Sequence, residues 1–281
     1  MINATDFKQA IQSIEALGVT PTVLVKIAEL TRDPDTDLDT ICTLLKNDGP
    51  LVADIIRISN SPYYAPATFH SNLTAAMNYV GLREVNRVLS LCLARRLFAR
   101  DLNSYGISAG DYWSLSVATA LVMEALAKQS GLNADDAYTI GILHAIGRVL
   151  INHVIERGGF RIFWDSAEPI EEWDRNAVGF DFAEAGAMLL EHWSFPAETC
   201  NIVRGQLKPV AAGEPLSLLG ALQFTQRVLA LTGWDLENQD WQLAEPDGYL
   251  QASGLTSEQV HRLVAACQQK YASILETVDL K

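Results

Sequence analysis

Apolar residues recur every three or four positions along nearly the whole of this 281-residue chain, and this period restricts the fold more than any other feature. Val85, Val88, Leu89 and Cys92, for example, would all lie on one side of a helix. No segment shows the strict alternation of apolar and polar residues that a half-buried strand requires. The sequence therefore predicts an all-α protein.

Helix-stopping residues divide this pattern into segments. The predicted helices are Leu38–Lys46, Leu51–Ser59, Leu73–Val80, 111–129, 134–157, 181–193, 196–206, 215–232 and 257–276. Residues 101–110 are rich in turn-forming residues and separate shorter helices from longer ones. We therefore expect an N-terminal helical subdomain over residues 1–105 and a larger helical bundle over 106–281.

The charge of the chain limits its partners. Acidic residues number 34 against 21 basic ones, and the net charge of −13 opposes nucleic acid and anionic membranes. Charged residues interrupt the apolar stretches before they could span a membrane, and we find no signal peptide. The four scattered cysteines are typical of buried thiols, which predicts a cytoplasmic protein without disulfides or a zinc site.

One run of eight residues, Gly141–Arg148, has the sequence Gly-Ile-Leu-His-Ala-Ile-Gly-Arg. Further blocks along the chain are Pro21–Leu24, Asp48–Leu51, Ile58–Tyr64, Ala75–Gly81, Trp113–Ala118 and His192–Pro196. In order and spacing, over about residues 14–233, they resemble the HDOD family, the HD-related output domain of bacterial signalling proteins. The resemblance implies an HD-domain or PDEase-like multi-helical bundle of the metal-dependent phosphohydrolase superfamily.

The resemblance also implies where metal ligands would lie. In HD phosphohydrolases the run corresponding to Gly141–Arg148 is Gly-Leu-Leu-His-Asp-Ile-Gly-Lys, whose His and Asp bind the metals that activate water. The ligand positions correspond to Leu115, His144, Ala145, Phe182 and, approximately, Gln206. Only His144 keeps a metal-binding side chain, whereas a hydrolytic site needs about three protein ligands and an open position. We therefore expect no metal cofactor, no catalytic residue and a hydrogen-bonded, interior His144.

A series of arginines is a candidate binding surface. Arg83 and Arg87, and likewise Arg96 and Arg100, are four residues apart, so each pair would lie on one helical face. The guanidinium groups could bind an acidic partner or a phosphate-bearing ligand. They could equally form ion pairs with acids on neighbouring helices.

A second candidate surface follows the predicted helix 51–59. Asn60, Ser61, Pro62 and Tyr63 stand at the helix end, where such residues usually stop a helix. A rigid corner with Tyr63 could also contact a partner, because tyrosine is enriched in interface hot spots.

These observations favour a non-catalytic bacterial signal-transduction module that binds an unidentified signalling protein or a small anionic ligand. One alternative is a metal-dependent phosphohydrolase of nucleotide or cyclic-dinucleotide phosphate esters, using His144 with Asp181, Glu184 or Glu191. Another is a nucleotide- or nucleic-acid-binding regulator that uses the arginines of 83–100. The partner, the input signal and the oligomeric state do not follow from the sequence.

Overall fold

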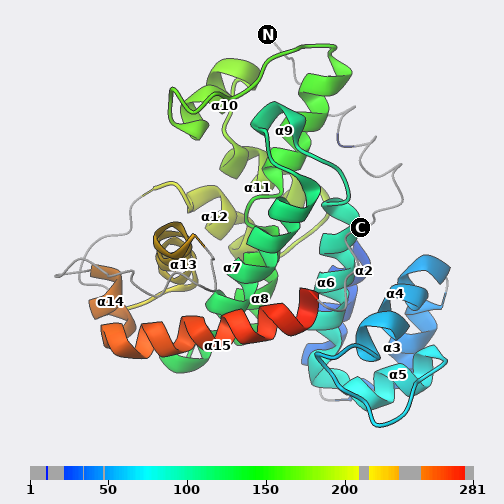
Figure 1. Ribbon diagram of the computed structural model, residues 1–281. Coiled ribbons are helices and arrows are strands. Elements are labelled where there is room, and N and C mark those ends of the chain that lie inside the picture. Colours follow the sequence, from blue (N-terminus) through cyan, green and yellow to red (C-terminus); the bar gives the residue numbers. More distant parts are fainter. Residues whose placement is uncertain are drawn as a thin grey trace.

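The computed structural model describes residues 11, 22–33, 35–46, 48–208, 215–233 and 248–275, and within them the chain is helical (Figure 1). The N-terminal elements are α2 (Thr22–Arg32), α3 (Leu38–Leu45), α4 (Gly49–Ser59), α5 (Leu73–Val80), η1 (Leu82–Glu84), α6 (Val85–Leu97) and η2 (Asn103–Tyr105). The later elements are α7 (Ala109–Ser130), α8 (Ala134–Leu143), α9 (Gly147–Arg157), α10 (Ile170–Val178), α11 (Phe182–His192), α12 (Ala197–Gly205), α13 (Leu218–Thr232), α14 (Gly248–Ser253) and α15 (Ser257–Leu275).

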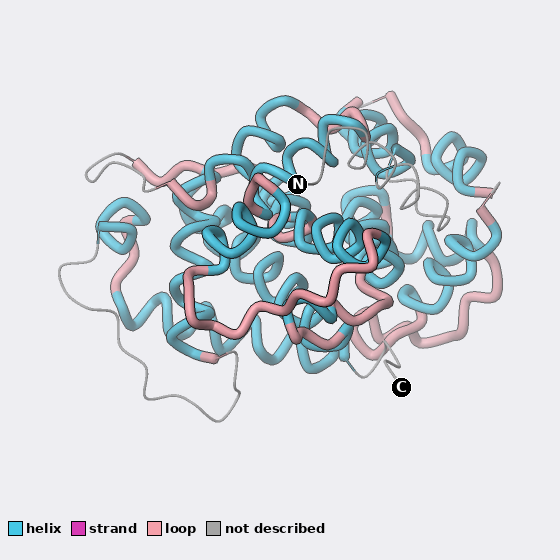
Figure 2. Tube along the Cα trace, turned by 90° about the horizontal axis from the view of Figure 1, so that it is seen from above, coloured by secondary structure: helices cyan, strands magenta, loops and turns pink. Residues whose placement is uncertain are grey.

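The all-α prediction is confirmed, because the described residues contain no strand and only an isolated bridge between Leu102 and Ile107 (Figure 2). Helices α3, α4 and α5 form a small group at one side of the molecule (Figure 1). Helix α6 connects this group to the bundle, since it packs against α2 and α4 on one side and against α7 and α8 on the other. Helix α15 returns from the far side and crosses α7.

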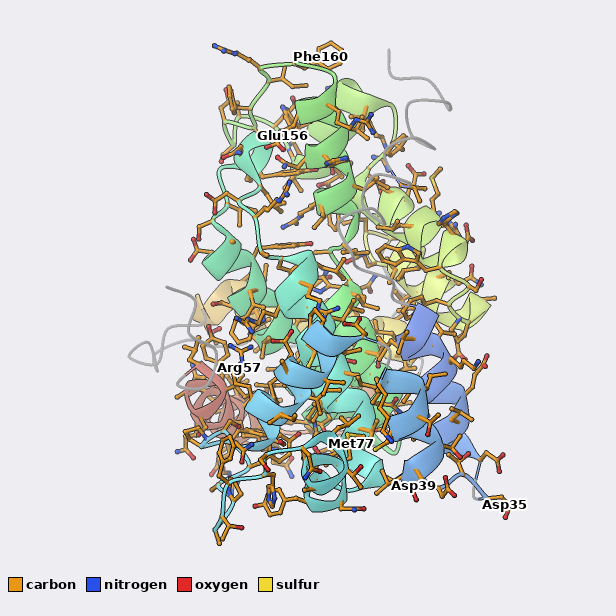
Figure 3. All side chains as sticks on the ribbon, turned by 90° about the vertical axis from the view of Figure 1, so that its right-hand side faces the viewer. Asp35, Asp39, Arg57, Met77, Glu156 and Phe160 are labelled. Atoms are coloured by element: carbon orange, nitrogen blue, oxygen red, sulfur yellow. The ribbon has the colours of Figure 1, made fainter. Side chains whose placement is uncertain are left out.

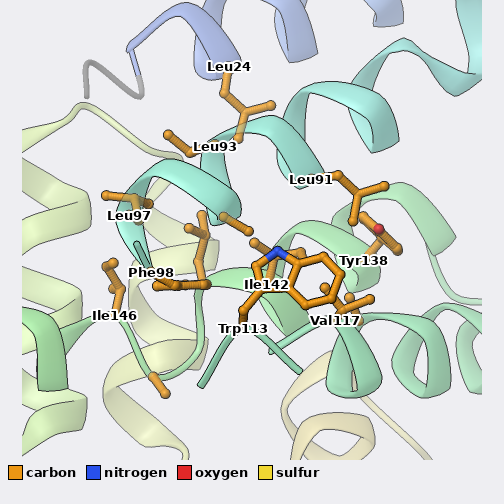
Figure 4. Packing of buried hydrophobic residues seen from close by; sticks show 14 of the residues in the cluster. Leu24, Leu91, Leu93, Leu97, Phe98, Trp113, Val117, Tyr138, Ile142 and Ile146 are labelled. Carbon is orange, nitrogen blue, oxygen red and sulfur yellow. The ribbon is translucent and has the colours of Figure 1, made fainter. Parts of the chain in front are cut away.

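One hydrophobic cluster extends from Ile11 to Ile274 among the described residues. Figure 4 shows part of this cluster, with Leu24 of α2 and Leu97 of α6 above Trp113 of α7 and Ile142 of α8. The helices on either side of residues 101–110 thus share a core, and the subdomain boundary there stays a prediction.

Two features of the helix order differ from the sequence prediction. The helix expected over 134–157 is two helices, because the chain turns at His144, Ala145 and Ile146 before α9 begins at Gly147. Helix α10 was not predicted, although the acidic pair in its first turn, Glu171 and Glu172, is a usual sign of a helix start.

The segment Ala134–Arg157 is long and apolar enough to cross a membrane by length and composition alone. However, 78% of its most apolar window is buried inside the protein, and a buried core helix meets the same criterion. The segment is therefore weak evidence for a membrane span.

The loop between α9 and α10 projects from the bundle. Phe160 and Phe163 in this loop are 53% and 62% exposed. Figure 3 shows Phe160 at the end of the molecule opposite Asp35 and Asp39. The loop therefore presents two phenylalanine side chains to solvent, far from the N-terminal helices.

All four cysteines, Cys42, Cys92, Cys200 and Cys267, are free and buried, as the sequence predicted. Burial raises the pKa of each thiol, since the thiolate loses its hydration in the apolar interior. The thiols are therefore protonated and shielded in the folded protein.

Two glycines of the Gly141–Arg148 run allow helices to approach within backbone contact. A Cβ atom at Gly141 would lie 2.5 Å from the Cα of Ala120 in α7. A Cβ atom at Gly147 would lie 2.0 Å from the carbonyl oxygen of Phe182 and 2.5 Å from the backbone nitrogen of Gly186, both in α11. These contacts fix α8 against α7 and α9 against α11.

We predict that Gly147→Ala destabilises the protein by at least about 2 kcal/mol, because the added methyl group must displace the α11 backbone. Urea unfolding followed by circular dichroism measures this change. Gly110→Ala in α7 is the matched control, since its Cβ would meet only the Ser108 side-chain oxygen at 3.8 Å. Equal stability of the two variants would contradict the predicted close approach.

Candidate functional site

The turn between α8 and α9 is held by two neighbouring helices. The Tyr112 hydroxyl of α7 donates a hydrogen bond to the carbonyl oxygen of Ala145. The Gln206 amide after α12 donates to the carbonyl oxygen of His144 at 2.7 Å. Because the turn carbonyls are bound from both sides, the His144 side chain has a defined position.

A pocket of about 360 Å³ opens beside this turn. Its lining consists of Leu115, Thr119, His144, Arg148, Ile170, Phe182, Leu207, Gln226, Leu229 and Ala230. Of the positions that the sequence singled out, Leu115, His144 and Phe182 meet here, on α7, the turn and α11. Ala145, within the turn, and Gln206, next to it, are buried and do not line the pocket.

His144 is a buried, neutral histidine, with 4% of its surface exposed. Its Nδ1 lies 2.8 Å from the carbonyl oxygen of Gly141, and a carbonyl can only accept, so Nδ1 carries the hydrogen. Burial is the main cause that lowers the pKa of His144 to about 4; the bond to Gly141 opposes this shift, and the nearby Arg148 charge contributes to it. The ring therefore presents an unprotonated Nε2.

Arg148 supplies a positive charge to the pocket. Its guanidinium carbon lies 4.4 Å from the centre of the Phe182 ring, which is a cation–π contact. Its Nε is buried and has no hydrogen-bond partner among the described residues. Phe182, at a position where the resemblance implies a metal ligand, is thus a platform for a cation.

The pocket does not fit a divalent metal ion. His144 is the lone His, Cys, Asp or Glu in its lining, and the described residues contain no group of three such side chains that could hold a metal. The Thr119 hydroxyl donates to the carbonyl oxygen of Leu115 at 2.8 Å. Besides this shortage of ligands, the positive charge of Arg148 in the lining would repel a metal cation.

The acids considered as replacement ligands have other roles. Asp181 caps α11, accepts from the backbone nitrogen of Glu184 at 2.8 Å and pairs with Arg175. Glu184 completes this capping box. Glu191 forms an ion pair of 2.8 Å with Arg204.

Asp174 is a site-supporting residue that sequence reasoning missed. It is fully buried and accepts hydrogen bonds from the Tyr105 hydroxyl at 2.7 Å and from the backbone nitrogen of Phe182 at 2.9 Å. Burial raises its pKa to about 6. A sequence pattern could have revealed this buried carboxylate. Asp174 stands four residues from both Ile170 and Val178, which places it on an apolar helix face.

The arginine series is largely paired within the protein. Arg87 pairs with Glu84 and with the buried Glu124 of α7, and stacks on the Tyr138 ring of α8 at 5.3 Å. Arg95 and Arg96 reach acids of α4 and its N-cap, at 2.7 Å to Asp54 and 3.0 Å to Asp48. Arg100 is exposed, and the side chain of Arg83 lies outside the described part of the chain. A docking role for the series stays a prediction.

The corner after α4 has a structural role. The Asn60 amide donates to the carbonyl oxygens of Ile56 at 2.7 Å and His70 at 2.8 Å, and its oxygen accepts from the His70 nitrogen at 2.8 Å. Ser61 is buried, and Tyr63 packs edge-on against Tyr64 with ring centres 4.8 Å apart. Asn60 therefore fastens the loop that follows the helix, and contact with a partner stays a prediction.

Comparison with known proteins identifies the family of this chain. The sequence model of the HDOD domain matches residues 17–209, which is more than half of the chain. The chain belongs to the HDOD family. The match lies within the range of about 14–233 over which the sequence blocks showed the resemblance.

Solved structures share the HDOD fold of this chain. A Geobacter sulfurreducens HDOD protein of unknown function has a TM-score of 0.66 at 18% identity, covering 98% of this chain and 99% of its own. A Shewanella amazonensis SB2B protein, whose name provisionally assigns it to the phosphohydrolases, has a TM-score of 0.67 at 20% identity, covering 96% of this chain and 98% of its own. At these identities the similarity shows the fold alone.

An uncharacterised protein of Treponema pallidum (strain Nichols) is 26% identical over 196 residues, which is 68% of this HDOD chain. The match covers 37% of that relative, so the chain spans well under half of its length.

We predict that His144 makes the protein less stable in acid. Between its ordinary pKa of 6.5 and its folded pKa of about 4, the unfolded chain binds a proton that the folded protein does not, so the free energy of unfolding decreases as the pH is lowered. His144→Asn keeps a donor for Gly141 and removes the titration. Between about pH 7 and about pH 4.5, the free energy of unfolding should decrease in both proteins. The decrease should be smaller in the variant than in the native protein, by on the order of 2 kcal/mol.

The control for this measurement is Asp174→Asn, whose effect has the opposite sign. The folded pKa of Asp174 is raised to about 6, so its protonation stabilises the folded protein as pH falls. Removing that group should make acid more destabilising. Equal pH dependence in native and His144→Asn proteins would contradict a buried, neutral His144.

We predict that Arg87→Met costs about 3 kcal/mol of unfolding free energy, because Glu124 is 3% exposed and would keep only Lys128 as a partner. Adding Glu124→Leu should recover part of this loss, since no buried charge then remains. Arg100→Met, at an exposed position, should change stability by less than about 0.5 kcal/mol. Equal effects of the two arginine variants in urea unfolding would contradict the buried ion pair.

Proposed function

We propose that this HDOD protein is a non-catalytic regulatory module that acts by binding rather than by hydrolysis. The observation that carries the proposal is the pocket at the α8–α9 turn. It brings together three of the implied metal-ligand positions, and of these only His144 has a side chain that binds metals. Leu115 and Phe182 supply apolar surface instead.

Charge supports the same conclusion. Hydrolysis of a phosphate ester in an HD site depends on metal ions that activate water and neutralise the developing negative charge. The lining of this pocket contains one guanidinium and no carboxylate. Such a lining attracts an anion but supplies neither a cluster of metal ligands nor a base beyond the neutral His144.

The rival functions have less support. For a phosphohydrolase, Asp181, Glu184 and Glu191 are engaged in a capping box or an ion pair and do not line the pocket. For a nucleotide- or nucleic-acid-binding regulator, Arg87 and Arg96 already pair with acids of the same chain. A phosphate would have to compete with those acids.

The proposed module receives its input from a separate signalling protein or from a small anionic ligand. The four buried, free thiols suit a reducing compartment, so we also propose a cytoplasmic location.

The first test is metal content and turnover of the full chain, purified without chelator. We expect well under about 0.1 equivalent of manganese, iron or zinc per chain, because one imidazole does not retain a divalent ion. With each metal added, hydrolysis of a cyclic dinucleotide and of 4-nitrophenyl phosphate should match the His144→Asn background. Bound metal of about one or two ions per chain, with turnover lost in His144→Asn, would falsify the proposal.

A gain-of-ligand variant tests the argument from ligand count. Ala145→Asp restores the acid at the second position of the His–Asp pair, but two ligands are still too few for a hydrolytic centre. We expect no turnover and a stability loss of about 2 kcal/mol or more, because Ala145 is 1% exposed and a carboxylate there loses its hydration. Hydrolysis by this variant would show that the missing ligands are present elsewhere.

A further inference from the structure

The pocket at the α8–α9 turn has the size and the walls of a small-molecule site. Its volume of about 360 Å³ lies at the lower end of the range for ligand pockets, roughly 300–1,000 Å³. Most of its lining is apolar, from Leu115, Ile170, Phe182, Leu207 and Leu229. Such walls favour a ligand with a hydrocarbon or aromatic body.

The positive charge in this pocket lacks a counter-ion among the described residues. Arg87, Arg95 and Arg96 each form an ion pair with a carboxylate, whereas Arg148 stacks on the face of Phe182 and forms no ion pair within the described part of the chain. The Asp174 carboxylate is close enough to interact electrostatically with Arg148. Its two oxygens, however, accept hydrogen bonds from the Tyr105 hydroxyl and from the Phe182 backbone nitrogen. The guanidinium is therefore stacked on one face and still able to bind an anion.

Two hydrogen-bond acceptors complete the polar part of the lining. Nδ1 of His144 is bound to Gly141, so Nε2 keeps its lone pair and has no hydrogen-bond partner among the described residues. The Gln226 amide donates to the side-chain oxygen of Gln206 at 2.8 Å, which fixes its orientation and leaves its own oxygen as an acceptor. The acceptors suit hydroxyl or N–H groups of a ligand.

We propose that this pocket binds a small organic anion that has an apolar body and at least one hydroxyl or N–H donor. Arg148 binds the carboxylate or phosphate group, His144 or Gln226 accepts from the donor, and Leu115, Ile170 and Leu229 enclose the apolar part. The inference rests on the proposed binding function and adds the chemical class of the ligand.

The test uses the fluorescent anion 1-anilinonaphthalene-8-sulfonate, which has a sulfonate, an N–H donor and an apolar body. Saturable binding to the full chain should weaken about tenfold or more in Arg148→Gln, because a charge-assisted contact is lost. Arg157→Gln is the matched control, since it removes the same charge from the same helix but does not line the pocket. The Arg157→Gln variant should bind the fluorescent anion as tightly as the native protein does.

A second variant keeps the test decisive if Arg148→Gln folds poorly. Ala230 lines the pocket from the exposed side of α13, so Ala230→Phe should fill the cavity without disturbing the core. It should also weaken binding of the fluorescent anion by about tenfold or more.

Competition then identifies the head group. 4-Hydroxyphenylacetate and 4-hydroxyphenyl phosphate, which share the phenol donor, should displace the fluorescent anion, and the stronger of the two tells whether the site prefers carboxylate or phosphate. The neutral analogue 4-hydroxyphenethyl alcohol should be at least about tenfold weaker, because it cannot pair with Arg148. Inorganic phosphate alone should be weak, since it leaves the apolar walls uncovered.

The inference is overturned by absent saturable binding, by equal binding in native, Arg148→Gln and Ala230→Phe proteins, or by equal displacement by the neutral analogue. Each of these results leaves the proposed function intact if the protein is metal-free and inactive. Conversely, bound metal with His144-dependent turnover overturns the proposed function, whatever the result with organic anions.

Discussion

Backbone contact at Gly147 determines the geometry of the whole site. The α9 backbone lies so close to that of α11 that a Cβ at Gly147 would overlap the Phe182 carbonyl and the Gly186 nitrogen. His144 in the turn and Arg148 in α9 lie on one side of this contact, and Phe182 in α11 lies on the other. Since the helices cannot slide apart without losing this contact, the Arg148–Phe182 stack and the pocket beside it follow from one glycine.

The electrostatics of this pocket differ from those of an HD metal centre. In an HD hydrolase, imidazoles and carboxylates surround cations, and those cations recognise phosphate. In this chain a guanidinium is itself the positive group of the pocket, and apolar side chains stand at two positions where the resemblance implies metal ligands. Fold similarity to a phosphohydrolase therefore says little about activity, because activity depends on donor atoms at particular positions.

The sequence was sufficient for the features that depend on local patterns. Helical periodicity gave the fold class, and the order of short blocks gave the HDOD family. Periodicity failed at His144–Ile146, where an apolar run continues through a turn that is held by hydrogen bonds from Tyr112 and Gln206. Those partners lie 33 and 62 residues away in the chain, so no local rule could find them.

Long-range pairing also explains why the partners of the arginines and of Asp174 depend on the fold. The i, i+4 spacing predicts shared helical faces, but α6 spans Val85–Leu97, so Arg83 and Arg100 lie outside it. Only the fold shows that Asp48, Asp54 and Glu124 meet the arginines of α6. Likewise, Asp174 becomes meaningful only when Tyr105 and the start of α11 are brought to it. Charge in a sequence predicts an interaction, whereas tertiary structure determines whether the interaction is internal.

The buried thiols have a practical consequence for following motions of this protein. Cys42 and Cys92 lie in the N-terminal helices, while Cys200 and Cys267 lie in α12 and α15. A protonated, shielded thiol reacts with an alkylating reagent only when the surrounding helices open. Each cysteine is thus a native reporter of local opening, and labelling rates at the four positions would map which part of the molecule loosens when a ligand or partner binds.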